Sequence, residues 1–156
     1  MIPISIPGFR DIQLHHLVSD YNGTLAVDGK LLPGVEKLLF ELSSNLEIHV
    51  ITADTFGLAA SQLKDLPVKL KITPVENQSE AKLSFVRELG VENVIAFGNG
   101  RNDRLMLKEA VIGIGLIQRE GGSAETLASA DAISTNILEA LDLLNNPKRL
   151  VATLRS

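Results

Sequence analysis

The sequence predicts an α/β domain in which a doubly wound, mostly parallel β-sheet lies between two layers of helices. Two observations support this class. Apolar runs alternate along the chain with segments of helical period. Most of these runs are apolar at consecutive positions, as expected for strands that are covered on both faces. The strand, helix, strand order then implies right-handed crossovers and a three-layer α/β/α arrangement.

The expected strands are the short apolar runs of this pattern. They span Leu14–Ser19, Leu46–Ile51, Val68–Ile72, Asn93–Phe97, Val111–Gly115 and, as a short last strand, Ala132–Ser134. Each run has the length of a strand and is bounded by polar or turn-forming residues. No repeat or linker interrupts the series, so we expect residues 1–156 to form a single domain.

The expected helices lie between these strands. They span Gly34–Ser44, Phe56–Lys64, Ser79–Leu89, Asn102–Glu109, Ala124–Ala130 and Asn136–Leu144, followed by a basic last turn over residues 148–155. Pro33 can occupy a helix start, Gly90 follows the third helix, and Pro147 separates the last two segments. We expect the last segment to pack on the protein's own sheet, because this is more common than a helix that docks a partner.

Composition limits the possible classes of protein. The chain has 156 residues, 45% hydrophobic content and a formal charge of −4, which suits one soluble domain with a sizeable core. It has no apolar stretch of membrane-spanning length, and its first residues lack the features of a signal peptide, so we expect a cytoplasmic protein. The absence of cysteine excludes thiol chemistry and thiolate metal sites. Scattered basic residues and few aromatics argue against a nucleic-acid partner.

Polar residues follow three of the expected strands at their carboxyl ends. Asp20 follows the first strand, Thr52 the second, and the sequence GlyAsnGlyArgAsnAsp, residues 98 to 103, the fourth. Any one of these residues could simply cap a turn or a helix. Open α/β sheets bind their ligands at the carboxyl ends of the strands, so the three together favour a functional site.

These residues resemble the motifs of the haloacid-dehalogenase-like (HAD) phosphohydrolases, which have a Rossmann-like core. The segment Asp20–Leu25 resembles the first motif, Asp-x-Asp-Gly-Thr-Leu/Val, and Gly98–Asp103 resembles the fourth, Gly-Asp-Gly-x-Asn-Asp. Thr52 and Lys82 stand where the second and third motifs would fall. The resemblance runs from about His16 to Ser134, and within the family it is closest to soluble proteins similar to the phosphorylation core of P-type ATPases.

This resemblance implies a phosphohydrolase or phosphotransferase that acts through an aspartyl phosphate on Asp20. Lys82 and Thr52 would assist catalysis by offsetting the repulsion between a carboxylate and a phosphate. Mg²⁺ is the implied cofactor. The implied substrate-binding residues are Asn22, Gly23, Thr24, Thr52, Ala53, Lys82 and Asn102. The implied metal ligands are Asp20, Asn22 through its backbone carbonyl, Asn99 and Asp103.

Two residues depart from the family pattern. Asn22 stands where family hydrolases have a second aspartate, which serves as general acid and base; without it the rate should fall by roughly 10² to 10⁴. Asn99 replaces a metal-ligating aspartate, so metal affinity should be weak. Asp103 keeps the aspartate of the family pattern and could bind the metal or support a residue that does. We therefore expect slow turnover of plain monoesters and faster turnover of substrates with good leaving groups, such as acyl phosphates or nucleotides.

The loop lengths leave no room for the cap domain that many family members carry. Residues 26 to 32 form only a short flap, and the stretch between Thr52 and Lys82 holds only a helix, a strand and a turn. The expected site is therefore open, and it would accept a phosphorylated small molecule or macromolecule, or be covered by a second subunit of a homo-oligomer. The alternative function is a non-catalytic module that binds phosphate or a protein partner.

The histidines and the remaining charged residues suggest no further site. His15, His16 and His49 lie within expected strands and are not arranged as a metal set, so we expect all three to be structural. Arg119 and Glu120 are expected to be solvated loop charges.

Overall fold

The computed structural model describes all residues from 1 to 156 and contains the expected parallel sheet. Its six strands are β3 (His16–Ser19), β6 (Glu47–Thr52), β7 (Lys69–Ile72), β8 (Val94–Gly98), β9 (Ile112–Leu116) and β10 (Ala132–Ser134). They lie in the order β10-β9-β8-β3-β6-β7, and every neighbouring pair is parallel. This is the doubly wound order, in which the winding reverses at the central strand β3.

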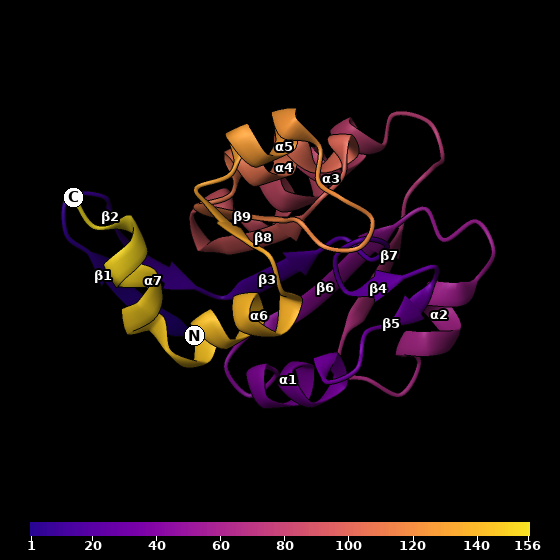
Figure 1. Cartoon of the computed structure of the whole chain (residues 1–156), viewed down its shortest axis with the longest axis horizontal. Coiled ribbons are helices and arrows are strands. Elements are labelled where there is room, and N and C mark those ends of the chain that lie inside the picture. The colour runs from indigo at the N-terminus through magenta and orange to yellow at the C-terminus, as the bar shows by residue number, and fades with distance from the viewer.

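Helices cover both faces of this sheet, which confirms the predicted three-layer α/β/α class (Figure 1). One face carries α1 (Val35–Leu42) and α6 (Ile137–Asn145), with α2 (Leu58–Leu63) at its edge; the other carries α3 (Gln78–Leu89), α4 (Arg104–Glu109) and α5 (Ala124–Ser129). Two short 3₁₀ turns, η1 (Val91–Asn93) and η2 (Arg101–Asp103), flank β8. The helix expected from Asn102 therefore begins as a 3₁₀ turn and becomes α-helical at Arg104.

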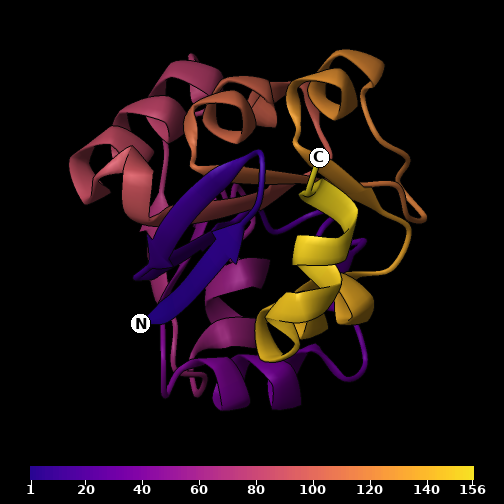
Figure 2. The same cartoon turned by 90° about the vertical axis from the view of Figure 1, so that its left-hand side faces the viewer.

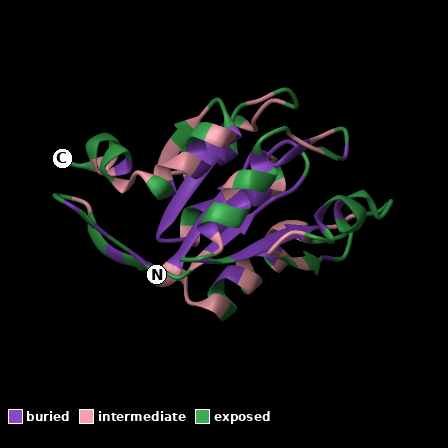
Figure 3. Ribbon diagram, turned by 90° about the horizontal axis from the view of Figure 1, so that it is seen from below, coloured by how far each residue is buried: buried purple, intermediate pink, exposed green.

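The central strands β3, β6, β8 and β9 are apolar at consecutive positions because both of their faces are buried (Figure 3). The edge strands β7 and β10 are exposed or half-buried. On β3, Leu17 belongs to the core beneath α1 and α6, whereas Val18 belongs to the core beneath α3 and α4. On β6, Val50 and Ile51 divide in the same way. This double burial fixes the central strands and with them the residues at their ends.

An N-terminal β-hairpin lies outside the main sheet, and the sequence analysis had assigned no structure to most of it. It consists of β1 (Ile2–Ile6) and β2 (Arg10–Leu14), paired antiparallel so that Ile4 faces Ile12. Helix α7 (Pro147–Leu154) contacts β1, so the C-terminal helix packs on this hairpin and not on the main sheet, as Figure 2 shows. The expected first strand accordingly begins at His16, two residues later than predicted, because Leu14 ends β2.

The chain carries no cap over the carboxyl ends of the strands. The predicted flap is a two-stranded hairpin of β4 (Ala26–Val27) and β5 (Lys30–Leu31). Its tip turns at Asp28 and Gly29, which have φ angles of 51° and 80°. Between β6 and α3 there are only α2 and β7. None of the helices combines the length and the apolar character needed to cross a bilayer.

Candidate active site

Asp20 stands directly after β3, at the point where the winding of the sheet reverses. Its backbone N–H continues the sheet by donating to the carbonyl of Phe97 at 3.0 Å, so the position of the Cα atom is fixed by β8. The residue is 8% exposed and lines a cavity of about 400 Å³ at the carboxyl ends of the strands. A carboxylate in this position is accessible to a ligand yet held by the rigid core.

Lys82 extends from α3 and is buried between two carboxylates. Its Nζ lies 2.8 Å from Asp20 Oδ1 and 2.7 Å from Asp103 Oδ1, and the lysine is fully buried. Burial alone lowers the pKa of a lysine, but the charges of Asp20 and Asp103 and their hydrogen bonds outweigh burial and raise the pKa of Lys82 above its usual value. The ammonium therefore stays charged and is held directly against Asp20.

Asp103 holds this lysine and the fourth-motif loop together. Its Oδ1 accepts from Lys82, and its Oδ2 accepts from the backbone N–H groups of Asn99 and Gly100, each at 3.0 Å. Burial, together with the charge of Asp20, raises the pKa of Asp103 to about 6 against the opposing effect of Lys82. Asp103 does not line the cavity; its carboxyl group packs directly against the backbone of Gly98, where a Cβ would lie 2.5 Å from its Cγ.

The turn after Asp20 brings Asn22, Gly23 and Thr24 to the site. Gly23 has a φ of +81°, and a Cβ there would lie 2.2 Å from Nδ2 of Asn99, so only glycine fits. The hydroxyl of Thr24 lies 3.5 Å from Asp20 Oδ2 and 3.3 Å from Asn99 Oδ1. Asn22 is exposed and lines the cavity.

The second strand end contributes Thr52 and Ala53. Thr52 is the last residue of β6, is 6% exposed and lines the cavity beside Ala53. The hydroxyl of Thr52 accepts a long hydrogen bond of 3.4 Å from the backbone N–H of Asp54. Asp54 has a φ of 44° and accepts from the backbone N–H groups of Ala59 and Ala60, which fixes the loop at the start of α2.

Two asparagines complete the set predicted from the sequence. Asn99 donates from Nδ2 to the carbonyl of Gly121 at 3.0 Å, which leaves its Oδ1 directed toward Thr24. Asn102 accepts from Lys82 at 3.3 Å and donates to Gln78 at 2.7 Å. All predicted site residues thus gather at one end of the sheet, although four of them do not line the cavity: Gly23, Thr24, Lys82 and Asp103.

Several cavity residues were missed by the sequence analysis. Asp54, Gln78 and Glu120 line the cavity. Glu120 is exposed on a loop, as expected, and the sequence analysis did not connect it with the site. Gln118 also supports the site, since its Nε2 donates to the carbonyl of Thr24 at 2.9 Å and its Oε1 accepts from the N–H of Ile137. The position of Asp54 two residues after Thr52 was a usable signal, but nothing in the sequence distinguished the loop residues Gln118 and Glu120.

The oxygen atoms around Asp20 fit a hard divalent cation. Asp20, Asp54 and Glu120 all line the cavity, and Lys82 is already balanced by Asp103, so a phosphate group would meet excess negative charge. Asp20 and Asn99 present oxygens that flank one hydroxyl, that of Thr24. Oxygen-only donors are those that Mg²⁺ prefers. Asp20, Asn99 and the backbone carbonyl of Asn22 could therefore hold Mg²⁺, with Asp103 acting through Lys82.

The fold is shared with solved members of the HAD superfamily. The cobalt-bound deoxy-D-mannose-octulosonate 8-phosphate phosphatase of Haemophilus influenzae matches with a TM-score of 0.72 at 10% identity, covering 92% of this chain and 94% of that chain. The 3-deoxy-D-manno-octulosonate 8-phosphate phosphatase of Moraxella catarrhalis, in complex with magnesium, phosphate and its sugar, matches with a TM-score of 0.66 at 20% identity, covering 91% and 94%. The chain thus has the cap-less HAD fold that the sequence motifs indicated.

Two further comparisons concern a P-type ATPase and a curated archaeal sequence. A zinc-transporting PIB-type ATPase matches with a TM-score of 0.64 at 25% identity over 78% of this chain, which corresponds to 20% of the pump. Among curated sequences, the chain is 48% identical to the uncharacterized protein MJ0073 of Methanocaldococcus jannaschii over 79 residues, which are 85% of that protein and 48% of this chain. The chain belongs to the same family as MJ0073. No protein-family model matches the sequence.

Proposed function

We propose that this protein is a Mg²⁺-dependent phosphohydrolase or phosphotransferase that acts through an aspartyl phosphate on Asp20. The observation that carries the proposal is the placement of Asp20, which faces the cavity while Lys82 holds its Oδ1 at 2.8 Å. A buried ammonium bound to a carboxylate on the strand that ends at the ligand-binding edge is suited to phosphoryl transfer. The HAD fold of the chain supports the same activity.

In the first step an oxygen of Asp20 attacks phosphorus, and the bond between phosphorus and the leaving oxygen breaks. Lys82 offsets the negative charge that Asp20 and the phosphoryl group bring together, and the Thr52 hydroxyl and the backbone amide of Ala53 offer donors to the phosphoryl oxygens. Bound Mg²⁺ would supply further charge neutralisation at the same oxygens. In the second step water attacks the aspartyl phosphate, which releases phosphate and restores Asp20.

Asn22 determines which substrates react well. At neutral pH its carboxamide can neither give a proton to the leaving oxygen nor take one from water. An acyl phosphate or a nucleotide expels a weakly basic oxygen that departs without a proton, so such substrates should be turned over faster than alkyl monoesters. The open, cap-less cavity also leaves room for a phosphorylated macromolecule or for a second subunit above the site.

The test is the release of p-nitrophenol from p-nitrophenyl phosphate and of phosphate from acetyl phosphate, each with and without Mg²⁺. We expect turnover that requires both Mg²⁺ and Asp20, that is faster on acetyl phosphate, and that is lost in Asp20→Asn. Asp65→Asn, a change of the same chemistry at an exposed position, is the matched control and should leave the rate unchanged. Asn22→Asp should raise the rate on p-nitrophenyl phosphate by roughly 10² to 10⁴.

The alternative is a module that binds phosphate or a protein without turnover, and the replacement of carboxylates by Asn22 and Asn99 is the observation in its favour. The proposed activity is overturned, and this alternative established, if neither substrate is turned over by any of three folded proteins. These are the wild type, Asn22→Asp and the double variant Asn22→Asp/Asn99→Asp.

A further inference from the structure

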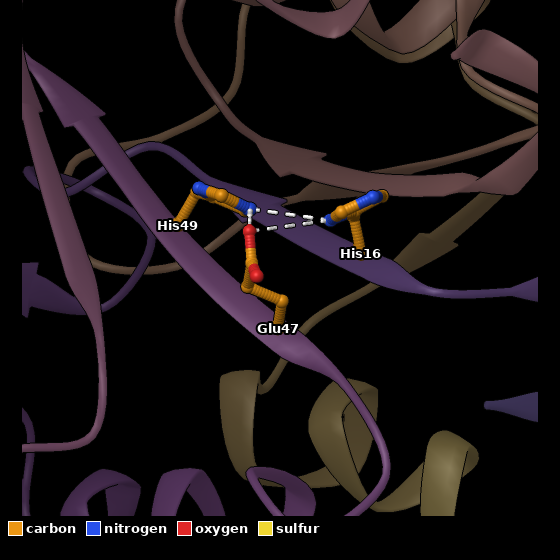
Figure 4. Close-up of side chains that lie close together, drawn as sticks. All are labelled: His16, Glu47 and His49. Atoms are coloured by element: carbon orange, nitrogen blue, oxygen red, sulfur yellow. Dashed lines mark hydrogen bonds and ion pairs between the residues drawn. The ribbon is translucent and has the colours of Figure 1, made fainter. Parts of the chain in front are cut away.

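A cluster of two histidines and a glutamate lies at the end of the sheet opposite Asp20. His16 begins β3, and Glu47 and His49 lie on the adjacent parallel strand β6. The register pairs His16 with Glu47, and side chains two residues apart on a strand point to the same face, so all three converge (Figure 4). From the sequence, the histidines were expected to be structural and not arranged as a metal set, but the pairing of β3 with β6 brings His16 and His49 together with Glu47 in a spacing that could hold an ion.

The spacing of the three side chains is that of ligands around one small cation. The distance from His16 Nδ1 to His49 Nε2 is 3.3 Å. From Glu47 Oε1 the distances are 2.9 Å to His49 Nε2 and 3.7 Å to His16 Nδ1. Tetrahedral ligands at a Zn–N distance of ~2.0–2.1 Å are separated by about 3.3–3.4 Å. The three observed separations bracket this value, so an ion could enter with small movements of the side chains.

The charge states of the cluster also suit a metal. Burial is the largest effect on both histidines, and it lowers the pKa of His16 and of His49 despite the opposing charge of Glu47. The neutral imidazole is the form of histidine that binds a metal ion. The hydrogen bond from Lys69 is the main reason why the pKa of Glu47 is lowered, which keeps the carboxylate charged.

Lys69 leaves the ligand atom of Glu47 free. Its Nζ lies 3.1 Å from Oε2, whereas Oε1 is the atom that faces the two histidines. A hydrogen bond to the oxygen that does not bind the metal orients a ligating carboxylate. On the inner side, the ring of Phe85 packs edge-on against His49 at 5.3 Å, which fixes the imidazole.

We propose that His16, Glu47 and His49 bind a transition-metal dication, with Zn²⁺ the best fit, at a site separate from the one at Asp20. Two imidazoles and one carboxylate are a ligand set used for Zn²⁺, whereas Mg²⁺ prefers oxygen ligands alone. The side chains of His16 and Glu47 are 20% and 42% exposed, so water can reach the fourth ligand position. The bound ion would link β3 to β6 at their amino ends.

The first experiment is a titration of the metal-free protein with Zn²⁺ by calorimetry and with Co²⁺ by visible absorption. We expect one ion per chain, visible absorption bands of tetrahedral Co²⁺ that Zn²⁺ displaces, and no competition from millimolar Mg²⁺. Added Zn²⁺ should also raise Tm, because an ion that binds only the folded state stabilises it.

Matched variants locate the ion. Glu47→Gln and His16→Asn should each weaken Zn²⁺ binding by at least the ~10- to 100-fold that loss of a supporting contact costs a metal site. His15→Asn changes an exposed neighbouring histidine outside the cluster and should bind Zn²⁺ as the wild type does. Asp20→Asn should also bind normally, which separates this site from the proposed phosphoryl site.

The proposal is overturned if the wild type binds no Zn²⁺ at one ion per chain. It is equally overturned if Glu47→Gln and His16→Asn bind as tightly as the wild type, or if binding is lost in His15→Asn or Asp20→Asn. Glu47→Gln keeps the shape of a partly exposed side chain, so its fold, checked by circular dichroism, should be intact. Because no readout is phosphatase activity, failure here is distinguishable from failure of the proposed function.

Discussion

Replacement of Lys82 by methionine tests the electrostatic design of the candidate active site. The ammonium lies within 2.8 Å of a carboxylate oxygen on each of Asp20 and Asp103. Methionine has a similar length but no charge, so the variant leaves two neighbouring buried carboxylates without their cation. We expect lower stability together with loss of Asp20-dependent turnover.

The expected loss of stability in Lys82→Met follows from the burial of the lysine and of the two carboxylates. Lys82 and Asp103 are fully buried and Asp20 is 8% exposed, so solvent cannot replace the lost contacts. Removal of one partner from a buried ion pair costs ~3–5 kcal/mol. For a domain of this size each kcal/mol lowers Tm by about 2–4 °C, so the variant should melt roughly 6–20 °C lower. Protonation of Asp103, whose pKa is already raised to about 6, should make the cost smaller at low pH.

The assay is urea unfolding of a double-mutant cycle. Lys82→Met/Asp103→Asn should recover part of the loss because one uncompensated charge is removed, giving an interaction energy of ~1–3 kcal/mol. The control Lys37→Met removes a lysine whose side chain is 83% exposed, and it should change stability by less than about 0.5 kcal/mol. A cost for Lys82→Met as small as that of the control, with no interaction energy, would refute the reasoning.

Two further predictions concern pH and backbone conformation. Folding lowers the pKa of His16 and His49 below 6.5, so the folded state binds fewer protons than the unfolded chain. The contribution of the two histidines to the free energy of unfolding is therefore full above pH 6.5 and is lost as the pH falls below it. In chelator, the stability difference between wild type and His16→Asn/His49→Gln should therefore shrink from about pH 7.5 to pH 5, and a constant difference would contradict this. Gly23→Ala adds a Cβ that meets Asn99 at 2.2 Å, whereas Gly57→Ala, also at positive φ, meets nothing within 4 Å. Urea unfolding should therefore show an overpacking cost ~1–3 kcal/mol larger for Gly23→Ala, and equal costs would argue against the close contact.

The central sheet could be predicted from sequence because its inner strands β3, β6, β8 and β9 are buried on both faces. Consecutive apolar residues such as Leu17 and Val18 are distinctive, whereas the order of the strands in the sheet is known only from the structure. The N-terminal hairpin was missed although Ile2, Ile4 and Ile6 alternate with exposed residues, a clear period-two pattern. The chain leaves β2 at Leu14 and enters β3 at His16 without a break in the apolar pattern. The boundary between the two strands therefore fell inside the single strand expected at Leu14–Ser19.

The gathering of the site residues was predictable because parallel strands end at the same edge. Asp20 and Asn99 each follow a strand and Thr52 ends one, and the strand order places those strands side by side. The role of Asp103 was not predictable at this level, since only the folded structure shows that both of its oxygens are already used by Lys82 and the loop amides. Glu120 reaches the cavity from a loop whose path no local pattern determines.

The histidine cluster required knowledge of strand pairing, because His16 and His49 are 33 positions apart and meet only through the register of β3 with β6. The same two strands carry the candidate active site at their other ends. Four residue steps from His16 to Asp20 span about 13 Å at ~3.3 Å per residue, which separates the two sites along the strand. Val18 and Ile51, both buried, fill the strands between the two sites. We therefore expect Glu47→Gln to weaken Zn²⁺ binding while Asp20-dependent turnover is retained, so the two sites can be tested independently in the same protein.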